Sequence, residues 1–410
     1  MCLYTYEGMH DSLLAPFFPI QAKLHHNSSK AFIGLTMSSV DIGDCAVNIV
    51  FLLFYTSGKI YKYSLIVSVI ISGFAVVVFG LCDLISNRYL YEISQVFFRT
   101  LTGVGAGVSF CLGIAFLSSI TDNQSRKSTL VSAAFTSYFT GIAIAPFVGT
   151  ILFKAMGYIS LFIFVGSCAI IPSSCLVPVR PLETCKNGQF SKDSNNCSSL
   201  IIFKNLYILQ ICFSLFVVNN IWGFIDSTFA WFLFSTFKLD EYIIGWIFSI
   251  GSFLGLVSSV VAIYVNSKNL FLLNYYLILA FQLLQLIIMC FSTVTRNLIA
   301  LLSGYAIHSY ARTMIGGTNI LCIRWYIDSK LSPKFNGNST TVSAATSNII
   351  CVLGRMFGSF FYGGILFEYL SFLQILFIFL FQAVLSTVAV ILLSFSKDSK
   401  VKELNPINFE

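Results

Sequence analysis

The sequence predicts an all-α polytopic membrane protein with twelve transmembrane helices in two related six-helix bundles. Three observations support this: the composition fits a chain surrounded by lipid, apolar runs of membrane-spanning length recur, and the second half repeats motifs of the first. The 410 residues are 57% hydrophobic and 10% charged, and the mean hydropathy is +0.84. A soluble domain carries about 25% charged residues, so this chain has too few to cover a water-facing surface.

Apolar runs of about 20 residues, the length a helix needs to cross a bilayer, alternate with short polar breaks. The longest break, 179–200, leaves six runs on either side. We therefore predict an N-terminal bundle over 1–178, a cytoplasmic linker at 179–200, a C-terminal bundle over 201–396 and a cytoplasmic tail at 397–410. The predicted spans are 2–20, 31–54, 64–83, 93–118, 129–152, 158–178, 201–235, 242–265, 270–292, 297–321, 341–366 and 370–395.

Lys and Arg residues are divided unequally between the two sets of predicted loops. The loops on the side of the linker and the tail hold 15 of the 24, and the opposite loops hold 6. Basic residues accumulate in cytoplasmic loops, so we expect both termini in the cytoplasm of a multi-pass protein of a vesicle or the plasma membrane. The net charge of +7 reflects this asymmetry and does not indicate nucleic-acid binding.

The first predicted span is unusually polar. It starts at the initiator Met and contains Glu7, His10 and Asp11. Such a segment inserts poorly alone. Either the start is truncated, or neighbouring helices hold the segment around a wet cavity; we favour truncation.

Four short motifs recur in one order at a separation of roughly 213 residues, as an internal repeat does. Arg99-Thr-Leu-Thr-Gly103 recurs as Arg312-Thr-Met-Ile-Gly316, and Asp11-Ser12 recurs as Asp226-Ser227. The other two pairs are GTILFKAMGYISLFIF with GGILFEYLSFLQILFIF, and Ile33-Gly34 with Ile244-Gly245. In a fold built from two parallel repeats, a solute site lies between the halves near the bilayer midplane.

Acidic residues inside the predicted spans are the first candidates for substrate or proton binding, because a charge at the bilayer centre costs about 2.5–3.5 kcal/mol. Asp41 and Asp44 share one helix face with Asn48. Two carboxylates in a partly dehydrated site are difficult to ionise together, so this pair predicts a proton site that works near neutral pH. Asp11 and Asp226 are the other acidic candidates. Alternatively, some of these carboxylates lie at the membrane edge and are merely solvated.

Three arginines and one histidine inside the spans form the second set of candidates. Arg99 lies one turn before Gly103 in a glycine-rich helix that can approach a neighbour closely. This favours a gating role over a side chain that extends to the membrane surface. Arg312 and Arg355 have the same two interpretations. His308, four residues before Arg312, is a candidate proton site, although an isolated histidine is more often structural.

Gly141, Pro146 and Gly149 interrupt the predicted fifth span. Glycine and proline in mid-helix loosen the backbone hydrogen bonding and allow tight packing of a neighbour. Packing alone explains these residues; the resulting kink could also determine which side of the molecule is sealed. In the seventh span, Trp222 could contribute to an aromatic site for an ammonium group, although packing is the simpler explanation.

No cofactor and no metal site are expected. The twelve Cys form no CxxC pair, and the four His show no metal-ligand or nucleophile–base spacing, so an enzyme is not predicted. The expected partners are a small cationic solute, protons and the lipid bilayer, without nucleic acid, and we expect a monomer.

Three segments resemble vesicular amine transporters of the major facilitator superfamily, and the vesicular polyamine transporter branch most closely: SLLAPFFPIQA (12–22), IGL (33–35) and WGFIDSTFAWFLFSTFKLDEYIIGWIFSI (222–250). The resemblance implies the major facilitator fold, with Arg99 at the arginine of one antiporter motif and Gly141, Pro146 and Gly149 at the kink motif. The chain departs from the family pattern at Gln21, where an acidic residue is usual, and at Ser227, where proline is usual.

Together these features predict a secondary active transporter that exchanges protons for a small organic cation, a polyamine or a monoamine. Carboxylates are natural partners of a cation, and protonating them would release it. We expect Asp44 and Asp226 to face one central cavity from opposite halves. The alternative is a diverged member that acts as a solute sensor or exports a different solute class. The repeat disfavours a channel.

Overall fold

The computed structural model of the chain describes residues 1–54, 61–119, 124–177, 205–267, 270–327 and 339–395. Nearly all of these residues are helical, and no strand occurs among them. The predicted linker, 179–200, and the predicted tail, 397–410, lie outside the described residues.

The N-terminal half contains six spans, of which the first is broken. The prediction of a continuous helix over 2–20 is wrong, because Leu13–Phe17 is irregular. Pro16 lies in this break, and proline cannot donate a backbone hydrogen bond inside a helix. The helices of this half are α1 (Cys2–Ser12), α2 (Phe18–His25), α3 (Lys30–Phe54), α4 (Tyr61–Leu81), α5 (Arg88–Ser119), α6 (Gln124–Ser167) and α7 (Ile170–Leu176).

Helix α6 carries both the fifth span and the start of the sixth. The chain reverses at Gly157, whose φ of 81° favours glycine. After this turn, Leu161 packs back against Gly149. The two predicted spans, 129–152 and 158–178, are therefore separated by a single-residue break.

The C-terminal half contains the other six spans. Asn205 and Asn297 cap the first and fourth of them by accepting backbone N–H bonds. The helices are α8 (Leu206–Phe237), α9 (Glu241–Ser267), α10 (Phe271–Thr295), α11 (Leu298–Tyr326), α12 (Ser339–Met356), which continues as a π-helical segment over Phe357–Leu366, α13 (Phe367–Tyr369) and α14 (Phe372–Phe395).

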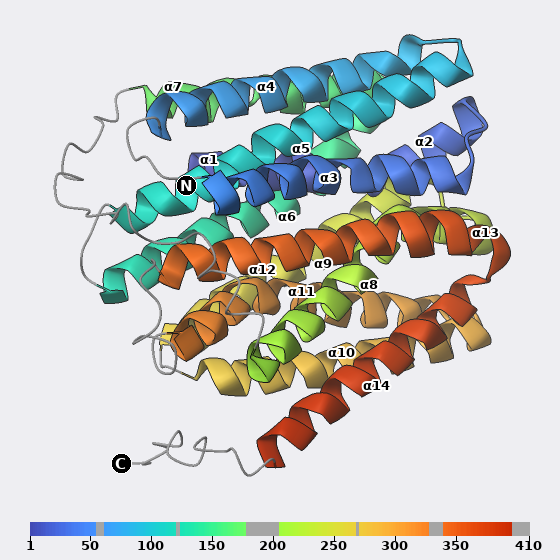
Figure 1. The fold of residues 1–410 in the computed structure, drawn as a ribbon. Coiled ribbons are helices and arrows are strands. Elements are labelled where there is room, and N and C mark those ends of the chain that lie inside the picture. Colours follow the sequence, from blue (N-terminus) through green and yellow to red (C-terminus); the bar gives the residue numbers. More distant parts are fainter. Residues whose placement is uncertain (55–60, 120–123, 178–204, 268–269, 328–338, 396–410) are drawn as a thin grey trace.

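Nine stretches within the described ranges are long and apolar enough to cross a membrane by composition. One of them, Ala133–Leu176, contains two spans. The first span is not among the nine because its break leaves two helices that are each too short. Helix α11 is not among them because His308, Arg312 and Arg324 make it too polar. With these allowances the described helices give the twelve predicted spans (Figure 1).

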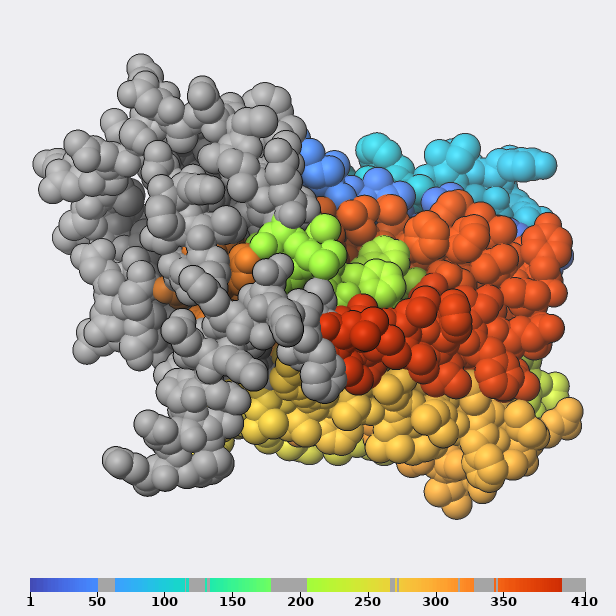
Figure 2. All heavy atoms as spheres, turned by 60° about the horizontal axis from the view of Figure 1, so that its bottom comes forward, coloured from blue at the N-terminus to red at the C-terminus, as the bar shows by residue number. Residues whose placement is uncertain are grey.

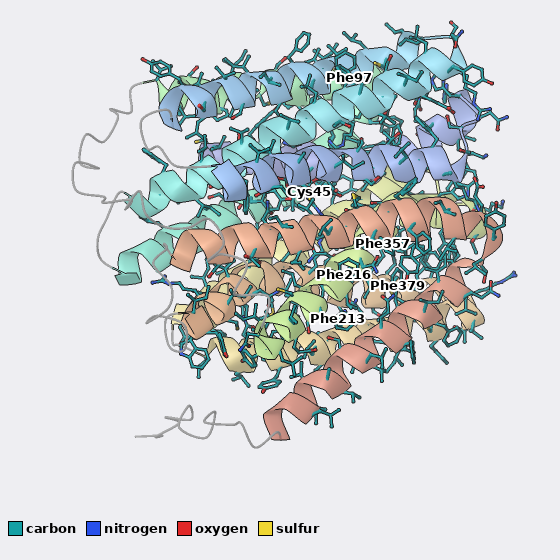
Figure 3. The ribbon with its side chains drawn as sticks, viewed as in Figure 1. Cys45, Phe97, Phe213, Phe216, Phe357 and Phe379 are labelled. Carbon is teal, nitrogen blue, oxygen red and sulfur yellow. The ribbon has the colours of Figure 1, made fainter. Side chains whose placement is uncertain are left out.

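Aromatic residues both fill the interior and cover the outer surface (Figure 3). Phe97 on α5 is 60% exposed, as expected for a side chain that faces lipid, whereas Phe379 on α14 is fully buried. Phe379 packs against Phe224 of α8 and Tyr362 of the π-helical segment.

Figure 2 shows α8 (green) reaching the surface beside α12 and α14. Its exposed apolar side chains, Leu206, Leu209 and Phe213, suit contact with lipid.

One close helix crossing occurs in both halves. A Cβ atom at Gly8 of α1 would overlap the carbonyl oxygen of Tyr138 on α6. A Cβ atom at Gly223 of α8 would likewise overlap the carbonyl oxygen of Arg355 on α12. Only glycine permits such an approach of two backbones. Tyr138 and Arg355 therefore occupy equivalent places in the two halves.

The two halves contact each other where α3 begins and α12 finishes (Figure 1). Gly34 of α3 lies against the backbone of Ser359 and Gly364. Lys30 Nζ donates a 2.8 Å hydrogen bond to the carbonyl of Phe367. These contacts join the two halves at this end of their interface.

Candidate functional site

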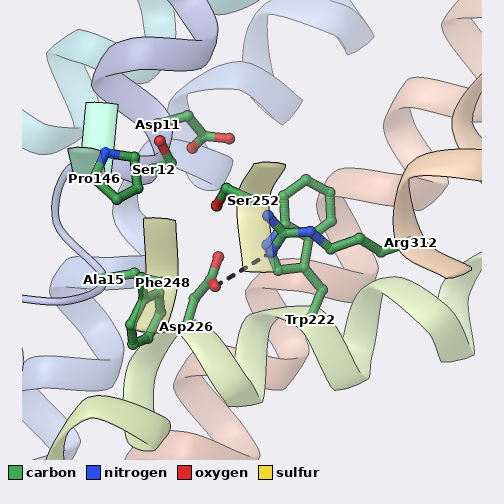
Figure 4. A pocket seen from close by; sticks show the side chains of 9 residues that line it. All are labelled: Asp11, Ser12, Ala15, Pro146, Trp222, Asp226, Phe248, Ser252 and Arg312. Carbon is green, nitrogen blue, oxygen red and sulfur yellow. Dashed lines mark ion pairs between the residues drawn. The ribbon is translucent and has the colours of Figure 1, made fainter. Parts of the chain in front are cut away.

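Two adjacent cavities lie between the halves, and both are lined by acidic residues. The larger cavity is lined by Glu7, Asp11 and Asp44 among others, and it extends toward the end at which α3 finishes and α12 begins. The smaller cavity is lined by Asp11 and Asp226 (Figure 4). The two cavities share Asp11, Trp222 and Arg312. Asp44 and Asp226 therefore line neighbouring cavities instead of the single cavity expected from the sequence.

Each half contains an ion pair between its first and fourth spans, in which the arginine is buried. In the N-terminal half, Arg99 Nη2 lies 3.8 Å from Asp11 Oδ1. In the C-terminal half, Arg312 Nη1 lies 3.6 Å from Asp226 Oδ1, and Figure 4 shows these two side chains facing each other. Asp11 and Arg99 of the first repeat thus form the same pair as Asp226 and Arg312 of the second.

Arg99 lies inside the protein. Its side chain is 2% exposed, and Nη1 donates a 3.2 Å hydrogen bond to the carbonyl of His10. A side chain that reached for the membrane surface would not be oriented toward α1. The structure therefore argues against that interpretation of Arg99.

Arg355 joins the two halves. Its Nη1 donates a 2.6 Å hydrogen bond to Asp11 Oδ2, and its Nη2 lies 2.6 Å from Asp41 Oδ1. The hydroxyl of Tyr138 donates to the same Asp11 oxygen at 2.5 Å. Asp11 thus has contacts with Arg99, Tyr138 and Arg355, whereas Asp41 forms an ion pair with Arg355 and with no other residue that the structure describes.

Asp44 differs from the other three aspartates. It is 8% exposed and lines the larger cavity. Asn48 Nδ2 donates to its Oδ1 at 2.5 Å, and Asn348 Nδ2, from the other half, approaches the same oxygen at 3.4 Å. Within the described part of the chain, no Lys, Arg or His nitrogen forms an ion pair with Asp44. This carboxylate therefore lines the cavity without a cationic partner.

The indole ring of Trp222 is already in contact with cations of the protein itself. The guanidinium carbons of Arg312 and Arg355 lie 4.5 and 4.9 Å from the ring centroid. Such contacts stabilise a cation near an aromatic face. In this structure two arginines of the protein itself occupy the ring face that the sequence analysis considered for an ammonium group.

His308 is fully buried on α11 and lines neither cavity. Neither of its ring nitrogens has a hydrogen-bond partner among the described residues. Its ring stacks 6.4 Å from that of Tyr305. The structure therefore places this candidate apart from the aspartates.

Glycine and proline residues of the predicted motifs shape the helix contacts around the site. Gly103 lies against the backbone of Val40 on α3, and Gly141 lies against that of Thr5 on α1. Gly149 contacts the side chains of Phe17 and Leu13. For these three glycines, the packing interpretation agrees with the observed contacts.

Pro146 lines the smaller cavity and changes the hydrogen bonding of α6. Because proline has no N–H, the carbonyl of Ile142 lacks its usual helical donor. The hydroxyl of Ser12 donates to that carbonyl at 3.1 Å. Ser12 therefore completes the hydrogen bonding of the kink from the neighbouring helix.

Two residues of the site were missed by the sequence analysis. Tyr138 is one of 19 tyrosines, and nothing in its local sequence marks it as a partner of Asp11. Asn348 lies in the eleventh span, 304 positions from Asp44. Asn348 could have been recognised from the sequence, because a polar amide is unusual inside an apolar span. No comparable feature distinguishes Tyr138.

The comparisons with known proteins begin with sequence relatives. A rat protein named "MFS-type transporter SLC18B1" is 23% identical over 253 residues, 60% of this chain and 51% of the relative. The human protein of that name is 22% identical over 242 residues, 58% of this chain and 50% of the relative. The chain spans about half the length of these relatives.

Solved structures of transporters share the fold. The xylose transporter XylE from E. coli, in a partially occluded inward-open conformation, has a TM-score of 0.70 at 15% identity, with 96% of this chain and 94% of that chain covered. A D-xylose-proton symporter has a TM-score of 0.72 at 16% identity, with 94% of each chain covered. A mutant form of the nucleoside transporter NupG has a TM-score of 0.64 at 12% identity, with 96% of this chain and 99% of that chain covered.

These relatives are named as transporters or as a symporter, which agrees with the prediction that the chain is not an enzyme. The TM-scores of 0.70 and 0.72 show that the twelve predicted spans are arranged in the fold of these solved transporters. The family model described as "Major Facilitator Superfamily" matches residues 1–359 of this chain. With this match over most of its length, the chain belongs to the Major Facilitator Superfamily of membrane transporters.

Proposed function

We propose that the protein is a secondary active transporter that exchanges protons for a small organic cation, a polyamine or a monoamine. The observation that carries the proposal is the Asp44 carboxylate in the larger cavity. Arg312 and Arg355 also line this cavity, yet Asp44 forms no ion pair with either of them or with any other residue described. Removing an ionised carboxylate from water without a partner is unfavourable. An ammonium group in the cavity would supply the missing partner.

Protons can compete for the same carboxylates. Asp11 of α1 and Asp41 and Asp44 of α3 are grouped around Arg355, and their charges repel one another. Binding of a proton to this group weakens its attraction for a solute cation. This competition supports an exchange in which a cation and a proton use the site alternately.

The position of the larger cavity suggests the direction from which a solute enters. The cavity extends toward the end of the bundle at which α3 and α5 finish and α12 begins. The loops predicted at that end carry the majority of the basic residues, which supports a cytoplasmic position for them. We infer that a cytosolic cation reaches Asp44 in this conformation and leaves into an acidic lumen or the exterior.

Uptake into proteoliposomes tests this function. Labelled spermidine, a monoamine and an organic anion are compared, each with and without an imposed pH gradient. The proposal expects cation uptake that the pH gradient drives, with no uptake of the anion. Uptake of the anion alone favours an exporter of another solute class, and cation binding without uptake favours a sensor; either outcome overturns the proposal.

A further inference from the structure

We propose that Asp11, Asp41 and the face of Trp222 form a second cation site beside Asp44, which Arg355 occupies here as a tethered cation. An ammonium or guanidinium group of the solute takes this site when Arg355 leaves. The inference rests on the proposed function for its role in transport. It adds a binding site, and it identifies the side chain that competes with the solute.

The surroundings of Arg355 match the chemistry that binds an organic cation. Two carboxylates from different helices, Asp11 of α1 and Asp41 of α3, each lie 2.6 Å from its terminal nitrogens. The ring of Trp222 faces the guanidinium at 4.9 Å. Carboxylates joined to an aromatic face recognise a cation through charge and the ring quadrupole.

Arg355 is held incompletely. Only its contact with Asp11 has hydrogen-bond geometry, and the contact with Asp41 is an ion pair alone. The Nε–H group has no hydrogen-bond partner among the described residues. A guanidinium offers five N–H donors. Because several of these donors lack an acceptor, replacing Arg355 by another cation costs few hydrogen bonds.

The backbone beside Arg355 provides a route for its movement. Arg355 is the next-to-last residue of α12, and a π-helical segment begins at Phe357. A π-helix has a wider turn than an α-helix and is frequent at functional sites. Conversion between the two forms would rotate Arg355 around the helix axis while the helix remains intact.

Displacement of Arg355 would couple solute binding to movement of the halves. The two carboxylates belong to the N-terminal half, and Arg355 belongs to the C-terminal half. A solute cation that takes the place of Arg355 neutralises the same carboxylates and removes this link between the halves. Binding would then release one of the contacts that join the two halves at mid-depth.

Chemical rescue of Arg355→Ala tests the site directly. The purified full chain is heated in detergent with increasing concentrations of ethylguanidinium or methylammonium. We expect the melting temperature of Arg355→Ala to rise and then level off, because a ligand that binds only the folded state stabilises it. Wild type and Arg355→Lys, in which a tethered cation fills the site, should show a smaller rise, because only the Asp44 site remains open to the added cation.

Two further variants separate a specific site from a general effect of the salts. Arg355→Ala combined with Asp41→Asn removes the carboxylate as well, so the additional rise should be lost. Arg88→Ala, at an exposed arginine, should behave as wild type. The proposal is overturned if the melting temperature of Arg355→Ala rises only as much as that of the double variant. It is also overturned if the rise equals that of wild type. If Arg355→Ala does not fold, Arg355→Gln takes its place.

Solute binding gives an independent measurement. If Arg355 fills the site in about nine of ten molecules, its removal raises the apparent affinity for spermidine about tenfold. An unchanged affinity in Arg355→Gln, with binding still dependent on Asp44, overturns the tethered-cation site and leaves the proposed function intact. The opposite result is also possible: ethylguanidinium stabilises Arg355→Ala, but wild type takes up no cation. That result supports the tethered-cation site and overturns the proposed function.

Discussion

Tyr138 and Arg355 occupy equivalent places in the two halves, and their side chains contact the same oxygen of Asp11. The carbonyl of Tyr138 faces Gly8, and that of Arg355 faces Gly223, at the repeated helix crossing. The Tyr138 hydroxyl and Arg355 Nη1 lie 2.5 and 2.6 Å from Asp11 Oδ2. One carboxylate of the first span therefore accepts a contact from the equivalent position of each half.

The first prediction concerns the two aspartates that line the neighbouring cavities. Asp44→Asn and Asp226→Asn should each abolish cation uptake, because an amide cannot replace the charge. Losing a hydrogen bond to a charged group costs about 1.5–3 kcal/mol, which is tenfold or more in affinity. Asp240→Asn, at an exposed aspartate that caps α9, is the control. Normal spermidine uptake in both cavity variants would exclude these carboxylates from the mechanism.

The second prediction concerns Arg99. Its guanidinium contacts both the carbonyl of His10 and the carboxylate of Asp11. Lysine has a single ammonium group and cannot reproduce this pair of contacts. Arg99→Lys should therefore reduce uptake in proteoliposomes, whereas Arg88→Lys, at an exposed position, should not. A fully active Arg99→Lys protein would show that positive charge alone is sufficient.

The third prediction concerns proton coupling. Cation uptake into acidified vesicles should collapse when a protonophore is added, because the pH gradient supplies the driving force. Asp41→Asn removes one carboxylate of the acidic group and should shift the pH optimum of uptake without abolishing transport. Initial rates measured across a pH series test this. Uptake that follows membrane potential and ignores the pH gradient would indicate a uniporter.

The fourth prediction concerns the repeated helix crossing. A methyl group at Gly223 would overlap the carbonyl of Arg355 and separate α8 from α12. Such overpacking costs about 1–3 kcal/mol, so Gly223→Ala should lower the melting temperature in detergent. Ala46→Val adds bulk at an exposed position of α3 and serves as the control. Equal melting temperatures for Gly223→Ala and wild type would contradict the close packing.

The fifth prediction concerns Ser12 and the kink at Pro146. Ser12→Ala removes the donor to the carbonyl of Ile142 and should cost about 0.6 kcal/mol, the average for such bonds in membranes. In a Pro146→Ala background the backbone N–H of residue 146 can bind that carbonyl, so the effect of Ser12→Ala should shrink. A double-mutant cycle of melting free energies measures this coupling. Additive effects would show that the two residues act independently.

Local sequence determined the number of spans and the internal repeat. Length and hydropathy of a run are properties of neighbouring residues, and lipid requires each span to satisfy its own backbone hydrogen bonds. The charged residues within the spans could also be identified, because lipid makes each of them costly. The first predicted span, 2–20, is instead two short helices separated at Leu13–Phe17, where Pro16 interrupts the backbone hydrogen bonding.

Tertiary structure alone decided which charge meets which. Asp41 and Asp44 are neighbours on one helix face, yet Asp41 pairs with Arg355 and Asp44 has no cationic partner among the described residues. Asp11 contacts partners 127 and 344 positions away. Such contacts depend on the way the helices pack, which is set by close approaches such as that of Gly223. The sequence therefore determined which residues carry charge inside the membrane, and helix packing decided how those charges are paired.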